Sequence, residues 1–310
     1  MKISGLEGRS LALIIRTSEL LYTPAMIDHD RLFKELLSTF FIEFLELFIP
    51  EIASTIAPNS LRFLQQEYFA DLVEGEEKVI DLLVEVKQAG RNATFLVHVE
   101  AQASSQAHFN RRMFHYFARL HQRHLKDIYP IVVFSFDEPY REEVNRYTVE
   151  FPNRKVLEFS FEAIQLNRLN WRDYLHQHNP VAAALMSKMQ IAPGDRPKVK
   201  AECLRLLATL RLDPARTRLI SGFVDTYLRL NSQEEQAFQE EVGKLEVNER
   251  EGIMQIVTSW AEQARQETQV EIARRMLAEK LPIETIARIT GLSVEQIEQL
   301  QKIDPQPPQA

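Results

Sequence analysis

The segment "IDLLVEVKQAGRNATFLVHVEAQ", residues 80–102, contains two apolar runs joined by four residues that are typical of a turn. Val, Leu and Ile dominate both runs, so we expect β-strands over 79–87 and 94–102, connected through "AGRN". Each run also contains a carboxylate, Asp81 in the first and Glu100 in the second. Burying an ionised acid costs free energy unless a partner compensates it. The segment is therefore either a hairpin with one solvated face or a hairpin that holds a cation.

The strand register decides whether the two acids meet. Side chains alternate along a strand, so Glu100 and Gln102 share one face. If Lys87 lies opposite Thr94 across the turn, Asp81 lies opposite Glu100. Directly opposed residues have Cβ atoms about 4.5–5.5 Å apart, and like charges at that separation repel each other. A cation between the two carboxylates would remove this repulsion.

The chemistry of such a pair points to a hard divalent cation. Mg²⁺ binds through one or two carboxylates together with waters and substrate phosphates. Asp81 and Glu100 are therefore candidate ligands of Mg²⁺ or Mn²⁺, which would activate a water and stabilise charge on a scissile phosphate. Gln102 is positioned to orient that water. Glu85 and Lys87 lie nearer the hairpin tip, and we expect both to be solvated.

The remainder of the first half combines helix-like and strand-like patterns. Apolar residues at helical spacing predict a helix over 29–48, ended by Pro50, and another over 106–124. Runs rich in β-formers favour further strands, which we place at 61–69, at 129–136 and twice within 146–161, around a Pro-Asn turn.

From Trp171 onward the pattern is helical. Helix periodicity extends over five segments: 180–190, 198–212, 215–230, 233–245 and 248–280. The tail 282–301 predicts two short helices broken at Gly291, with Ser293 and Gln296 forming a capping box. This spacing is typical of a helix-turn-helix, but the second helix has two Glu and no basic residue before Lys302. We therefore favour packing or oligomerisation over DNA reading for the tail.

Composition limits the function classes. The chain has 310 residues, of which 45% are hydrophobic and 26% charged, as expected for a cytoplasmic protein of one or two globular domains. Its single cysteine, Cys203, excludes an intrachain disulfide. The longest apolar stretch, 38–53, is interrupted by Glu43 and Glu46, so we expect no membrane span. The net charge of −7 means that any DNA contact is local.

Several motifs together resemble a known family. They are "DHDRLFKELL" at 28–37, "IDLLVEV" at 80–86, "FLVHVEAQ" at 95–102, "FNRRMFHYFARL" at 109–120 and "IARRMLAEKLPIETIARITGLSVEQIEQLQ" at 272–301. In their order and spacing they resemble the bacterial Rpn-like "recombination-promoting nuclease/putative transposase" family, within the PD-(D/E)XK nuclease superfamily. The likeness covers about residues 26–301.

The resemblance implies an α-β-β-β-α-β core and a set of site residues. Asp81 matches the first metal-binding acid of the superfamily, and Glu100 matches the acid of its (D/E)xK motif. Glu35 matches the helix acid that supports the metal. Gln102 stands where the general pattern has Lys, so the positive charge that Lys provides is absent from that position.

The helix 106–126 is the most basic segment, so its cations either contact phosphate or form a solvated face. Arg112 and Tyr116 match an Arg and a Tyr that the family has on this helix. Together with Arg119, they are the residues that we expect to bind DNA phosphates.

The resemblance thus implies a Mg²⁺-dependent DNA endonuclease linked to recombination or a mobile element. The alternative is a catalytically weak or inert nuclease fold that acts as an oligomeric interaction module. We expect a homo-oligomer in either case. The expected fold is α+β, a mixed sheet flanked by helices, followed by an all-α region. The expected ranges are a dispensable extension 1–25, a nuclease-like domain 26–165, a helical region 166–280, a helix-turn-helix-like tail 281–303 and a disordered end 304–310.

Overall fold

The computed structural model describes residues 29–303 apart from 65–67, 71–76 and 80. The predicted extension 1–25 and the predicted disordered end 304–310 lie outside the described residues. The chain divides into two compact units, one of residues 27–252 and one that contains the C-terminal residues from Ile253 onward. Each is described by itself.

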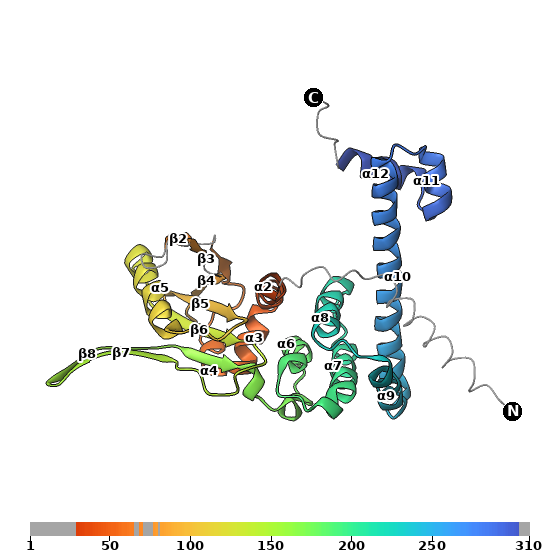
Figure 1. Cartoon of the computed structure of the whole chain (residues 1–310). Coiled ribbons are helices and arrows are strands. Elements are labelled where there is room, and N and C mark those ends of the chain that lie inside the picture. The colour runs from red at the N-terminus through yellow and green to blue at the C-terminus, as the bar shows by residue number, and fades with distance from the viewer. Residues whose placement is uncertain (1–28, 65–67, 71–76, 80, 304–310) are drawn as a thin grey trace. The chain divides into compact units, whose positions relative to one another are not determined.

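A five-stranded mixed sheet lies at the centre of the first unit (Figure 1). Its strands, in spatial order, are β1 (Arg62–Phe63), β4 (Leu82–Lys87), β5 (Thr94–Gln102), β6 (Ile128–Phe134) and β9 (Glu162–Gln165). The pairs β1–β4 and β4–β5 are antiparallel, whereas β5–β6 and β6–β9 are parallel. The predicted α+β class is confirmed. The strand predicted at 129–136 corresponds to β6, whose position between β5 and β9 accounts for its continuous apolar run.

The β4–β5 hairpin has the predicted register. Lys87 pairs with Thr94, and the ladder continues to Leu82 opposite Val99. The strand predicted over 79–87 is interrupted, because β3 (Glu77–Val79) pairs instead with β2 (Tyr68–Ala70) in a separate two-stranded sheet. Asp81 therefore lies immediately before β4 rather than within it.

The predicted helix 29–48 is two helices, α2 (His29–Thr39) and α3 (Phe41–Phe48). Phe40 separates them because its backbone is not helical, with φ −121° and ψ 44°. The apolar spacing continues through this break, since Phe40 and Phe41 are both buried. Pro50 does follow the end of α3, but it is also the first residue of α4 (Pro50–Ala53), where its fixed φ suits a helix start.

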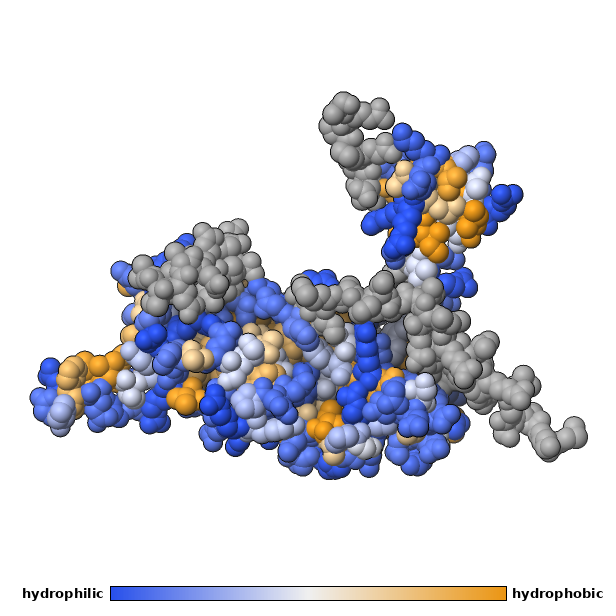
Figure 2. All heavy atoms as spheres, viewed as in Figure 1, coloured by the Kyte–Doolittle hydropathy of each residue, from blue (hydrophilic) through white to orange (hydrophobic). Residues whose placement is uncertain are grey.

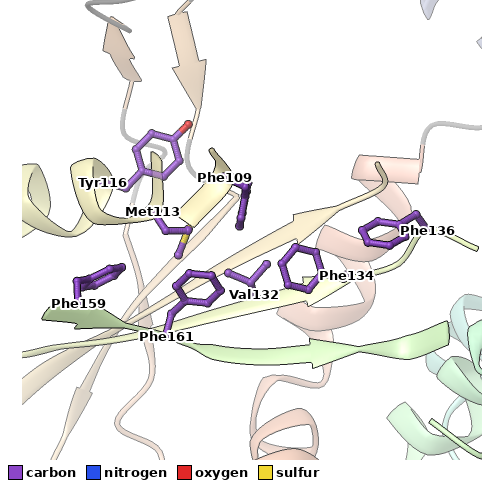
Figure 3. Close-up of a cluster of buried hydrophobic side chains, with 8 residues drawn as sticks. All are labelled: Phe109, Met113, Tyr116, Val132, Phe134, Phe136, Phe159 and Phe161. Carbon is purple, nitrogen blue, oxygen red and sulfur yellow. The ribbon is translucent and has the colours of Figure 1, made fainter. Parts of the chain in front are cut away.

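Helix α5 (Phe109–His124) covers one face of the sheet (Figure 1). Phe109, Met113, Tyr116 and Leu120 are buried beneath this helix, whereas Phe117 is half-buried. Three of these residues join aromatic and branched side chains of the sheet and its flanking strands in one buried cluster (Figure 3). Its members are Phe109, Met113, Tyr116, Val132, Phe134, Phe136, Phe159 and Phe161.

Strands β7 (Arg146–Phe151) and β8 (Arg154–Ser160) form a separate antiparallel ribbon around the Pro152-Asn153 turn, as predicted (Figure 1). The chain then returns to the sheet through β9, a strand that was not predicted from the sequence.

The predicted helical half is confirmed. After two short 3-10 helices, η1 (Leu166–Arg168) and η2 (Trp171–Tyr174), the chain forms α6 (Pro180–Leu185). The predicted segment 180–190 continues past α6 as the 3-10 helix η3 (Met186–Lys188), and η4 (Pro193–Asp195) follows. The longer helices are α7 (Arg196–Leu210), α8 (Pro214–Tyr227), α9 (Ser232–Gly243) and α10 (Val247–Ala278).

In the C-terminal unit, α11 (Ile283–Thr290) and α12 (Val294–Ile303) pack on the end of α10. Gly291 ends α11 with a left-handed φ of 73°, where the predicted break lies. The capping box is formed: the N–H of Gln296 donates to Oγ of Ser293 at 3.2 Å, and the N–H of Ser293 donates to Oε1 of Gln296 at 2.8 Å. In the part of the chain that the structure describes, no helix combines the length and apolar character needed to cross a membrane.

Candidate active site

Alternate side chains of β5 face α5 and place a row of polar groups under that helix. The ring of His98 meets the ring of Tyr116 edge to face, with centroids 6.0 Å apart. His98, Glu100 and Gln102 are 0%, 3% and 8% exposed, respectively. The alternative of a hairpin with a solvated polar face is therefore wrong for these three residues. Their burial means that each polar atom needs a partner inside the protein or a ligand.

Asp81 and Glu100 meet as the register predicts. The backbone N–H of Ala101 donates to Oδ2 of Asp81 at 2.7 Å. The backbone N–H of Asp81 in turn points to Oε1 of Glu100 at 3.4 Å. Each acid is thus tied to the strand segment that carries the other, which fixes the two carboxylates close together.

The electrostatics of this pair favour a cation. Burial and, after it, the negative charge of Glu100 raise the pKa of the Asp81 carboxyl from an ordinary 3.8 to about 8, although the Ala101 hydrogen bond opposes this rise in pKa. Two side chains of α2 also act on this pKa: Asp30 raises it and Lys34 lowers it. The site therefore disfavours two negative charges on its own. A divalent cation bound by oxygen ligands would favour the doubly ionised pair, so the residues fit Mg²⁺ or Mn²⁺.

His98 supports Glu100 from the same strand. Its Nε2 lies 2.8 Å from Oε1 of Glu100, so with Glu100 ionised this nitrogen carries the hydrogen and donates it. The other ring nitrogen, Nδ1, is buried and has no hydrogen-bond partner among the described residues. His98 was not among the predicted site residues. Its position two residues before Glu100 on a strand was the available signal.

Gln102 is joined to α5 through Arg112. Nη2 of Arg112 donates to Oε1 of Gln102 at 2.9 Å, and Nη1 donates to Oε1 of Gln106. The guanidinium also lies over the ring of Phe109, 4.6 Å from its centroid. Among the described residues no carboxylate pairs with Arg112, so its positive charge is held beside Gln102 by uncharged groups.

The other predicted site residues have different surroundings. Glu35 is exposed on α2, and the α2 charges that act on Asp81 are those of Asp30 and Lys34. Tyr116 is 3% exposed, and its predicted contact with phosphate stays a prediction. Arg119 is half-buried on α5. The metal-supporting role of Glu35 and the phosphate-binding role of Arg119 stay predictions.

The expectation that Glu85 is solvated is wrong. Its side chain is 14% exposed and accepts a hydrogen bond from Nζ of Lys126, while Nη1 of Arg62 lies 3.3 Å from Oε2. Lys87 is exposed, as predicted. Glu85 therefore joins β4 to its neighbours and does not form part of the acidic pair.

The carboxylate pair offers two ligands to a metal ion. In the described ranges, no three His, Cys, Asp or Glu side chains gather as ligands for one ion. Two carboxylates suffice where waters and substrate phosphates complete the coordination, as is usual for Mg²⁺ in phosphoryl chemistry.

Two family models match this chain. A family model described as "Putative transposase, YhgA-like" matches residues 27–213, and one described as "Rpn/YhgA-like nuclease family, C-terminal HTH domain" matches residues 266–302. The first contains the whole hairpin and α5, and the second contains α11, most of α12 and the end of α10. Neither the search of curated proteins nor the search of solved structures gave a match.

Proposed function

Since the chain belongs to the Rpn/YhgA-like family of putative transposases and nucleases, we propose that it is a metal-dependent DNA endonuclease that hydrolyses phosphodiester bonds in recombination or in the movement of a mobile element. The observation that carries the proposal is the facing pair Asp81 and Glu100. Burial and mutual repulsion raise the pKa of Asp81, as expected for carboxylates arranged for a divalent cation.

Each side chain of the site has a role in this reaction. Asp81 and Glu100 would hold Mg²⁺ or Mn²⁺, which supplies an activated water and neutralises charge on the scissile phosphate. His98 orients Glu100 through its Nε2 hydrogen bond. Arg112 presents a positive charge beside Gln102, where a negative phosphate oxygen could accept its hydrogen bonds.

Gln102 and the acidic net charge favour a second candidate, a weakly active or inert nuclease fold that acts as an oligomeric interaction module. An amide at position 102 offers no positive charge of its own, and the charge of −7 opposes broad contact with DNA. This candidate predicts self-association in light scattering without cleavage.

Nicking of supercoiled plasmid at fixed salt separates the two candidates, with Mg²⁺, Mn²⁺ or EDTA in parallel samples. We expect metal-dependent nicking that Asp81→Ala and Glu100→Ala abolish, whereas Gln102→Ala weakens it less because Gln102 does not hold the ion. Asp173→Ala, which removes an exposed acid on η2, is the matched control and should cut like the parent.

Cutting by Asp81→Ala or Glu100→Ala at the parental rate would show that the assigned site is wrong. A parent protein that nicks with neither metal while it self-associates would favour the interaction module. Fixed salt is essential, because electrostatic binding to DNA falls steeply as salt rises.

A further inference from the structure

The β7–β8 ribbon has two distinct ends. Its base is packed against α5: the ring of Tyr147 stacks on Phe114 with centroids 5.4 Å apart, and the ring of Phe159 lies 5.1 Å from that of Phe117. Its distal end, from Glu150 to Val156, is exposed at every residue. The structure thus holds one end of the ribbon in place and presents the other to solvent.

The base of the ribbon is attached beside the candidate active site. Nδ2 of Asn110 donates to the backbone oxygen of Arg146 at 2.6 Å. Asn110 is two residues from Arg112, whose guanidinium contacts Gln102. The start of the ribbon is therefore attached to α5 within one helical turn of the residue that contacts Gln102.

The distal end of the ribbon carries solvent-exposed apolar side chains. A register shift after Val149 leaves Val156 without a cross-strand partner, so the ribbon is irregular near its tip. Phe151 and Val156 are 57% and 54% exposed. Figure 2 shows apolar residues gathered over this ribbon. Large apolar side chains exposed together are typical of a surface that binds something.

The ribbon as a whole has one more basic than acidic residue. Residues 146–160 contain three basic residues, Arg146, Arg154 and Lys155, and two acidic ones, Glu150 and Glu158, in a chain whose net charge is −7. Glu158 is engaged by both Arg146 and Lys155. In the described part of the chain Arg154 makes no ion pair, and it lies directly opposite Phe151 at the tip.

We infer that this ribbon is a DNA-binding arm that enters a groove of the duplex beside the scissile phosphate, with Phe151 against the sugars and bases and Arg154 on a phosphate. The inference rests on the proposed function, because DNA is its ligand. The major groove of B-DNA admits a two-stranded β-ribbon, and apolar side chains flanked by Arg are a recurrent means of gripping a groove. Attachment next to Arg112 favours the substrate over a second copy of the chain as the occupant.

The ribbon also sets the position of the contact. The six residues of β7 span about 17 Å at a rise of about 3.4 Å per residue. Successive base pairs are separated by about 3.4 Å along the duplex. For a ribbon that lies along the duplex axis, the tip should therefore touch DNA about five base pairs from the point where the ribbon begins.

Binding of a fluorescently labelled 30-base-pair duplex, followed by anisotropy in EDTA so that nothing is cut, tests the inference. We expect Phe151→Ala combined with Arg154→Ala to raise Kd about tenfold, and to lower the slope of log Kd against log salt by about one, since one phosphate contact is lost. The matched control is Val247→Ala combined with Arg250→Ala, which removes an apolar residue of similar exposure (56%) and an exposed Arg from α10. The control should leave Kd unchanged.

Three results separate this inference from the proposed function. A parent that nicks plasmid, paired with a ribbon variant that binds and cuts like it, overturns the inference and leaves the function standing. A parent that binds DNA but never nicks it, with binding weakened in the ribbon variant, overturns the function and supports the arm. A ribbon variant whose mass in light scattering falls while Kd is unchanged makes the ribbon a contact between copies, which also overturns the inference.

Discussion

Replacing Asp81 with Asn should change how the stability of the metal-free protein depends on pH. The pKa of Asp81 is raised in the folded chain, so the folded state binds its proton more tightly than the unfolded state between about pH 4 and pH 8. The stabilisation that the Asp81 carboxyl contributes is complete below its pKa in the unfolded state, 3.8. It is lost as pH rises through the folded pKa, because the parent must then bury two repelling carboxylates.

The magnitude follows from the same pKa. A rise from 3.8 to about 8 corresponds to an upper limit of about 6 kcal/mol in the free energy of unfolding. Asp81 is only partly buried and shares the cost with Glu100, so solvent screening reduces this limit to about 2 kcal/mol. The amide of the Asp81→Asn variant keeps an oxygen for the N–H of Ala101 and carries no charge. We expect this variant to be about 2 kcal/mol more stable than the parent at pH 9, and nearly equal to it at pH 4.

Urea denaturation in EDTA at several pH values measures this difference. The chain has two compact units, and two-state analysis needs a signal from one of them. The signal should therefore come from Trp171, which is fully buried in the unit of residues 27–252, in a Trp260→Phe background. Added Mg²⁺ should stabilise the parent more at pH 9 than at pH 5, and should barely stabilise Asp81→Asn. Equal stability of parent and Asp81→Asn across the whole pH range would refute the reasoning, because the two acids would then not repel each other.

Three further substitutions test individual contacts. Gln102→Lys should lower the free energy of unfolding by about 1 kcal/mol or more and should reduce nicking. The reason is that the new ammonium would lie against the guanidinium of Arg112. Faster nicking by this variant would mean that the Arg112 side chain moves away freely. Glu85→Ala should cost roughly 0.5–1 kcal/mol in urea denaturation through the lost pairing with Lys126, and no change would support a solvated Glu85. Gly291→Ala should lower the stability of the C-terminal unit by about 1 kcal/mol, because the φ of 73° at this position is unfavourable for alanine. The fluorescence of Trp260 in urea denaturation measures this change, and an unchanged urea midpoint would contradict it.

The sequence allowed prediction of features whose causes are local. Strand alternation and the turn residues between Lys87 and Thr94 were enough to set the hairpin register, and through it the meeting of Asp81 with Glu100. The break at Phe40 could not be predicted, since the apolar spacing of a buried helix runs through it unchanged. Strand β9 was missed for a related reason: it has four residues, and its place in the sheet comes from pairing with β6.

The origin of the positive charge at the site is a non-local feature of this kind. The PD-(D/E)XK pattern that the sequence resembles has Lys at the position of Gln102, so the sequence alone indicates a loss of positive charge there. In the folded chain the amide oxygen of Gln102 accepts a hydrogen bond from Arg112, ten residues later on a different element. A lysine at 102 would compete with that guanidinium for the same space, whereas glutamine gives it a hydrogen-bond acceptor. Gln102 and Arg112 thus form one unit, in which the strand supplies the acceptor and α5 supplies the charge. Arg112→Ala should therefore reduce nicking more than Gln102→Ala does.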